Sequence, residues 1–111
     1  PPYLWVSVAA TLKATRRADR EGLRHAAEGA LYSYIHPTRG GPEGAGWPFG
    51  RPLHISELYS LLQGVSGVEY VEALDLYPVD AATGQQQAAA QRVTPPPDGL
   101  LCSHTHTVKV S

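Results

Sequence analysis

The chain has 111 residues, of which 42% are hydrophobic and 17% are charged, and its formal net charge is −1 at pH 7. This length predicts a single domain over residues 1–111 with one modest core. The near-zero charge argues against nucleic acid or an anionic membrane surface as a partner, because both need a concentrated basic field. The one cysteine, Cys102, cannot form an internal disulfide, and no apolar run approaches the roughly 20 residues of a membrane span. We therefore expect a soluble, cytoplasmic protein without membrane insertion.

A strand and a helix are the first predicted elements. Residues 3–13 alternate between apolar and polar side chains, which predicts a strand with one apolar face. From about Ala18 to Ile35 apolar residues recur every three or four positions, as in an amphipathic helix, and Pro37 ends this pattern. Gly22 and Gly29 fall inside the helix, where each costs about 1 kcal/mol relative to Ala. We expect either of them to permit close packing on the sheet.

A loop rich in glycine and proline follows, with the sequence GGPEGAGWPFGRPLH over residues 40–54. It lacks the G-K-[ST] ending of a phosphate-binding loop, and it follows a helix instead of a strand, so we exclude phosphate binding. Trp47 and Phe49 are large packing units, and Arg51 can stack on their rings or bond loop carbonyls. We expect a rigid plug at one end of the sheet, with both rings mostly buried and Arg51 hydrogen-bonded. The candidate structural loop or subunit interface consists of Trp47, Pro48, Phe49, Gly50 and Arg51.

A short helix and a long strand come next. Residues 54–64 contain Ser56 as a helix start signal and Gly64 as a stop signal. A strand is predicted from Val68 to Val79, and its apolar residues change parity in the middle. A bulge near Glu72 accounts for that change.

The last third of the chain is predicted to be mostly extended. Residues 81–91 lack apolar periodicity and indicate a hairpin loop, and residues 92–93 form a short extended piece. Asp98 and Gly99 make a turn, and residues 100–111 form one final strand. The order of elements predicts an α+β fold: a small mixed or antiparallel sheet of about three strands, with two helices packed on one face and the long Gly/Pro-rich loop between them.

Two histidines in the final strand raise the question of a metal site. His104 and His106 would point to the same face, a spacing that metal sites use, and His36 and His54 are conceivable third ligands from loops. No Asp or Glu lies close in sequence to complete a shell. We therefore favour a structural role for these histidines and predict no metal and no cofactor.

Two alternative functions stay open at this point. A small metal-dependent or thiol hydrolase would use His104, His106 and Cys102, which alternation places on one side of the strand, with Ser103 on the other. A peptide or carbohydrate binding module would use Trp47 and tyrosines such as Tyr70 and Tyr77. Exposure of the aromatic rings distinguishes a binding surface from a buried plug.

Several phrases together resemble a known family. The helix ends in LYSYIHP, the loop reads GGPEGAGWPFGR, and SELY and GVSGVEYV follow, with SHTHTVKV at the end. In these phrases the chain resembles the baseplate J-like proteins, the baseplate assembly proteins of contractile phage tails and related injection particles. The resemblance implies a non-enzymatic wedge subunit that assembles in the cytoplasm, as part of a baseplate, with no catalytic residues.

The resemblance also implies partners and a larger context. The partners would be other wedge, hub or sheath-proximal proteins and further copies of the same chain. The family proteins are several times longer, so the 111 residues would be a C-terminal domain. The start at PPYLW and the absence of Met agree with a segment of a longer chain.

Overall fold

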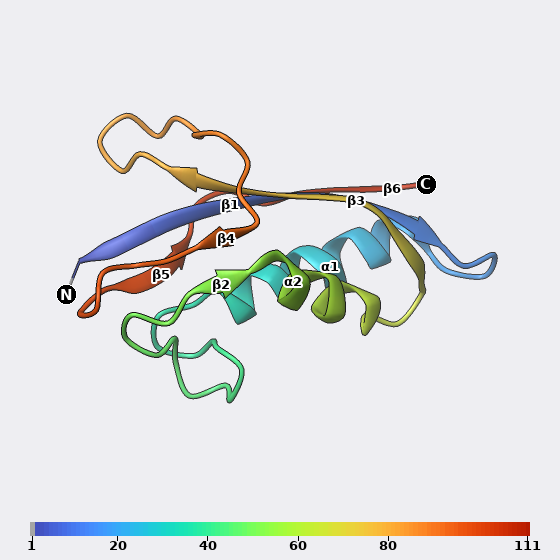
Figure 1. The fold of residues 1–111 in the computed structure, drawn as a ribbon. Helices are drawn as coiled ribbons and strands as arrows, with labels where there is room; N and C mark the ends of the chain where they lie inside the picture. The colour runs from blue at the N-terminus through green and yellow to red at the C-terminus, as the bar shows by residue number, and fades with distance from the viewer. Residues whose placement is uncertain (1) are drawn as a thin grey trace.

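The computed structural model describes residues 2–111 and shows an α+β fold in which two helices cover one face of a mixed four-stranded sheet (Figure 1). The predicted fold class is confirmed. The long loop joins the first helix to a separate two-stranded sheet just before the second helix. The elements are β1 (Tyr3–Ala14), α1 (Arg20–Tyr34), β2 (Leu53–His54), α2 (Ile55–Gln63), β3 (Val68–Val79), β4 (Arg92–Val93), β5 (Leu100–Ser103) and β6 (Thr107–Val110).

Strand β1 forms the centre of the large sheet. Strand β3 pairs with it in antiparallel orientation, and β5 and β6 lie end to end along its other edge, both parallel to it. The register places Thr11 opposite Ala73 and Leu12 opposite Val71, which leaves Glu72 as an extra residue. The predicted bulge at Glu72 is confirmed.

The prediction of one final strand over residues 100–111 is wrong. The chain is paired as β5 and β6, with a break at residues 104–106. At this break the ring of His106 turns inward, and its Nδ1 accepts the hydrogen bond that the Val8 N–H donates, at 3.0 Å. A side chain thus replaces the backbone partner of β1 over this short stretch.

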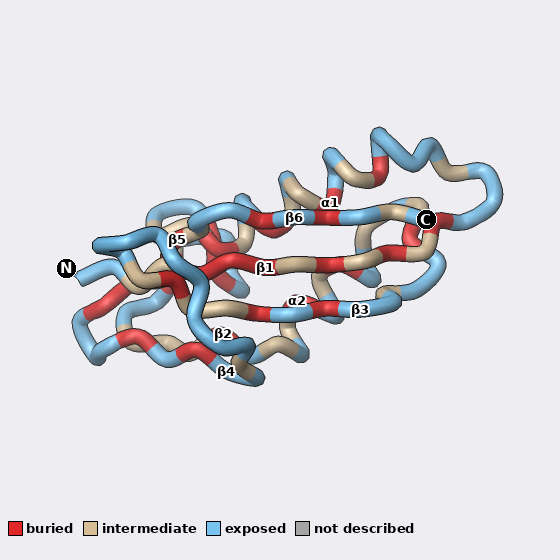
Figure 2. The backbone as a smooth tube through the Cα atoms, turned by 90° about the horizontal axis from the view of Figure 1, so that it is seen from above, coloured by how far each residue is buried: buried red, intermediate tan, exposed pale blue. Residues whose placement is uncertain are grey.

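The core lies between β1, β3 and the two helices. Figure 2 shows buried residues recurring along β1, as expected from its alternation. Helix α1 contributes Leu23, Ala27 and Leu31 to the core, and α2 contributes Leu58 and Leu62. These spacings of three and four residues place the apolar side chains of each helix on one stripe facing the sheet.

The prediction that Gly22 and Gly29 permit close packing on the sheet is wrong. Both are exposed on α1. A Cβ atom at Gly29 would meet nothing within 4 Å, and one at Gly22 would meet only the Asp19 side chain. Neither glycine therefore serves the packing of the helix on the sheet.

After β3 the chain turns back in a tight hairpin, with an antiparallel bridge between Val79 and Gln86. The hairpin does not continue as a paired strand, because Arg92 and Val93 pair with β2. On the way, the backbone N–H groups of Gln87 and Ala90 donate to the carbonyls of Pro78 and Leu76 at 2.8 Å each. The segment therefore covers the last part of the β3 edge before it crosses to β2. Within residues 2–111, neither helix combines the length and the apolar character needed to cross a membrane.

Candidate functional site

Trp47 is the point at which the long loop is fixed to the domain. Its side chain is 2% exposed, and its Nε1–H donates to the carbonyl of Arg51 at 2.8 Å. The ring of Tyr34 meets it edge-on, with 5.7 Å between ring centres. The predicted burial of Trp47 is confirmed, and the indole closes the loop upon itself at the end of α1.

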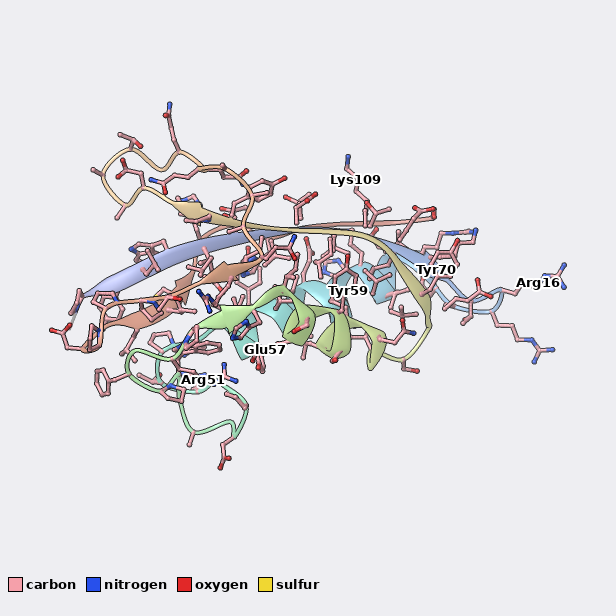
Figure 3. The ribbon with its side chains drawn as sticks, viewed as in Figure 1. Arg16, Arg51, Glu57, Tyr59, Tyr70 and Lys109 are labelled. Atoms are coloured by element: carbon pink, nitrogen blue, oxygen red, sulfur yellow. The ribbon has the colours of Figure 1, made fainter. Side chains whose placement is uncertain are left out.

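Arg51 links the loop to the start of α2. Its guanidinium carbon lies 5.1 Å from the centre of the Trp47 ring, and its Nη1 is 2.9 Å from Oε1 of Glu57. The same nitrogen donates to the carbonyl of Pro52 at 3.1 Å. Figure 3 shows Arg51 below Glu57, between the loop and the helix. The prediction that Arg51 is hydrogen-bonded within the domain is confirmed.

Glu57 collects contacts from three directions. Besides Arg51, it accepts hydrogen bonds from the Tyr34 hydroxyl at 2.5 Å and from the His54 N–H at 2.9 Å. Burial alone would raise the pKa of Glu57, but the hydrogen bonds from Tyr34 and His54 and the pair with Arg51 outweigh it and lower the pKa. Burial, followed by the bond to Glu57, raises the pKa of Tyr34 to about 12. Both groups therefore keep their protonation states over the whole neutral range.

The contact from His54 also sets where α2 begins. The helix begins at Ile55, with His54 as its N-cap residue, so the start signal expected at Ser56 is wrong. Glu57 occupies the third helical position, from which a glutamate can reach back to the N-cap N–H. The carboxylate of Glu57 thus holds the loop, through Arg51, and the start of the helix, through the His54 N–H.

Gly50 fixes the other side of the loop. Its φ is +68°, in the left-handed region that favours glycine. Its N–H donates to the carbonyl of Gly99 at 2.9 Å, and a Cβ atom at this position would stand 3.0 Å from the backbone of Pro97. The loop is therefore tied to the turn before β5 as well as to α2.

Phe49 lies between these fixed residues and is 64% exposed, so the prediction that its ring is mostly buried is wrong. The space beneath the loop is occupied by Trp47 and the Arg51 guanidinium stacked on it. With Gly50 held against Pro97, the chain turns outward and the phenyl ring has no site in the core. The structure therefore presents the only Phe of the chain to solvent, on a loop that is held on both sides.

The histidines and the cysteine near the C-terminus do not come together as predicted. His106 is buried against α1, where its backbone N–H donates to the Tyr32 hydroxyl at 3.1 Å. His104 is exposed, and Cys102 is buried beside Trp5 on the opposite face of the sheet. Burial raises the pKa of the Cys102 thiol, which disfavours the reactive thiolate. The expectation that Cys102, His104 and His106 share one side is wrong, because the break between β5 and β6 changes the parity.

Ser103, expected to lie on the other side, is the residue that meets His106. Because Nδ1 of His106 accepts from Val8, its proton sits on Nε2, which is 2.7 Å from Oγ of Ser103. Oγ in turn donates to the carbonyl of Ile35 at 2.8 Å. The imidazole donates to the serine here, whereas a general base must accept its proton. The arrangement holds the strand break against the end of α1.

The possible metal ligands are also dispersed. His36 accepts from the Thr38 N–H within its own turn, and His54 stands at the start of α2. Within residues 2–111, no group of three or more His, Cys, Asp or Glu side chains is arranged to hold a metal ion.

Sequence reasoning missed the link from Tyr34 to Glu57 to Arg51. Its signal is present as the Glu of S-E-L-Y, three residues after His54, where a capping glutamate stands. Nothing in the sequence indicates that this Glu also receives Tyr34, because the contact spans 23 positions.

No model of a known protein family matches the sequence. A search of curated proteins gives no match either. The likeness to baseplate J-like proteins therefore rests on the quoted phrases alone.

Proposed function

We propose that this chain is a structural assembly domain of the baseplate J-like type and that Phe49 is its contact with a neighbouring subunit. The observation that supports it is the 64% exposure of Phe49 on a loop held by Trp47, Gly50 and Arg51. A few large side chains, aromatic ones among them, contribute most of the energy of typical protein interfaces. A ring presented on a rigid loop loses little conformational entropy on binding.

The phrase that carries the family resemblance contains the residues that build this arrangement. G-W-P-F-G-R supplies Trp47 and Arg51, which hold the loop, and Phe49, which it presents. The proposed partners are the other wedge, hub or sheath-proximal proteins of a baseplate and further copies of the chain, assembled in the cytoplasm. The proposal includes no enzymatic activity and no cofactor.

The alternatives find less support in the geometry. A hydrolase would need His106 as a base, and its ring donates to Ser103 instead. The binding module was expected to use Trp47, and that residue is 2% exposed. Tyr70 is 46% exposed, but it lies on β3, away from the loop.

The test is photocrosslinking within assembling particles. A benzoylphenylalanine introduced at position 49 should crosslink to a baseplate protein, and Phe49→Ser should remove the domain from particles while the free energy of unfolding stays within about 0.5 kcal/mol. Tyr59, which is 42% exposed on α2, supplies the matched control, since Tyr59→Ser should assemble normally. Normal particles containing Phe49→Ser would refute the proposal.

A further inference from the structure

A small hollow lies on the sheet face that the helices leave open. After β3 the chain makes a tight turn over this face (Figure 1), closed by the Asp80 N–H donating to the Gln85 carbonyl at 2.9 Å and the Gly84 N–H donating to the Asp80 carbonyl at 2.7 Å. The hollow has a volume of about 190 Å³, and Trp5, Asp80, Ala81, Gly84 and His104 line it. Three segments far apart in the sequence therefore meet here.

The walls of the hollow are held in place by their backbone surroundings. Trp5 lies in β1 between Val79 and Cys102, which are 4% and 6% exposed. Oδ1 of Asp80 accepts the Ala82 N–H at 2.9 Å, which orients the carboxylate. The N–H of His104 donates to the carbonyl of Val6 at 2.8 Å. These contacts orient the carboxylate and fix the backbone positions from which the indole and the imidazole border the same small space.

The charge and the size of the hollow define what it can take. No ion pair joins Asp80 to a basic side chain within residues 2–111, so its charge favours a cation and repels an anion. A metal ion would lack a third protein ligand among those residues. Pockets for drug-sized molecules begin at roughly 300 Å³, so a volume of about 190 Å³ suits a group the size of one side chain.

We propose that the Trp5–Asp80–His104 hollow binds one cationic side chain, arginine in preference to lysine, from a partner chain. A guanidinium stacks on an indole face, and its planar fork has donors for both a carboxylate and an imidazole nitrogen. An ammonium is a more strongly hydrated point charge and gains less from the ring. The site is separate from the Phe49 contact and does not depend on it.

The partner chain is a second copy of this chain. Its Arg16 and Arg17 are exposed in the turn between β1 and α1, and Figure 3 shows Arg16 at the far end of the molecule, pointing away from it. Neither has an ion-pair partner within the described part of the chain. These two arginines are therefore available to the hollow of another copy.

The test is a titration of the ¹⁵N-labelled 111-residue chain with N-acetyl-arginine-N-methylamide, followed by NMR. The expected result is a saturable shift of the Trp5 indole N–H and of the His104 amide, with a dissociation constant in the millimolar range. The norleucine analogue, which lacks the charge, should produce no such shift. Equal shifts with the norleucine analogue, or shifts only outside the hollow, would overturn the proposal.

Two variants make the test specific. Asp80→Asn keeps the oxygen that accepts the Ala82 N–H and removes the charge, so it should weaken binding at least about fivefold with the turn intact. Asp75→Asn is the matched control, because Asp75 is exposed on the same sheet face outside the hollow and should leave binding unchanged. Undiminished binding to Asp80→Asn would contradict the proposal.

The source of the cation is decided by dilution of the unliganded chain. If a second copy supplies it, the Trp5 signal moves with protein concentration and Arg16→Ala with Arg17→Ala removes that dependence. A signal that is independent of concentration while the arginine probe binds would overturn the assignment to a second copy and point to an arginine of a different protein.

Discussion

The burial of His106 makes the stability of the domain depend on pH. Its ring is 3% exposed, and burial, with a smaller contribution from the neighbouring His104, lowers its pKa from 6.5 to about 4. Protonation of Nδ1 would also remove the acceptor of the Val8 N–H. The groups that face the ring are Ser103 and Tyr32, neither of which carries a charge to compensate a protonated imidazole.

The sign and the size of the effect follow from linkage. Between pH 6.5 and about 4 the unfolded chain binds a proton at this position and the folded chain does not, so the stability contributed by the neutral ring is complete above pH 6.5 and falls as the pH falls toward 4. Each pKa unit corresponds to about 1.4 kcal/mol, so the full loss is about 3 kcal/mol. That is a large part of the roughly 5–15 kcal/mol by which domains are stable.

The assay is urea unfolding at pH 7.5, 6.5, 5.5 and 4.5, followed by tryptophan fluorescence. In His106→Gln the side chain can still accept from Val8 and donate to Ser103 but does not titrate. Between pH 6 and 4.5 the wild-type chain should lose about 1.4 kcal/mol per pH unit more than this variant. Subtracting the free energies of unfolding of the variant from those of the wild type also removes the acid sensitivity contributed by Glu57, which both chains share.

Equal pH dependence of the wild type and His106→Gln would refute this reasoning. If the variant does not fold, an NMR titration of His106 in the wild type decides the matter. A pKa near 6.5 in the folded chain would show that the ring is accessible to protons and that the hydrogen bond to Val8 does not hold it neutral.

Three further substitutions test the loop and α1. Gly29→Ala should stabilise the domain by about 0.5–1 kcal/mol in urea unfolding, because a Cβ there meets nothing and Ala favours the helix; a destabilised variant would mean that the glycine has a packing partner. Glu57→Gln should lower the free energy of unfolding by about 1–2 kcal/mol and flatten its dependence on salt, since it leaves Arg51 without its charged partner. Gly50→Ala should destabilise by about 2 kcal/mol or more in the same assay, because its φ is +68° and the new Cβ would stand 3.0 Å from the Pro97 backbone. Unchanged stability of the Gly50→Ala variant would show that the loop is not tied to this turn.

The sequence by itself determined the elements whose causes are local. Alternation over residues 3–13 and the spacing of apolar residues in α1 are properties of neighbouring residues, and both elements formed within two residues of their predicted bounds. The parity change that located the bulge at Glu72 is local as well. For the same reason the fold class could be predicted from the order of elements.

Only the tertiary structure decided where distant segments meet. The bond between Val8 and His106 joins residues 98 positions apart and splits the expected last strand into β5 and β6. Trp47 and Phe49 are two residues apart in the same Gly/Pro-rich loop, yet Trp47 is buried and Phe49 is exposed. The reason is that Tyr34 and Arg51 surround a space for one ring only. Which side chain occupies a given site in the core depends on segments that are distant in sequence. No local sequence pattern contains that information.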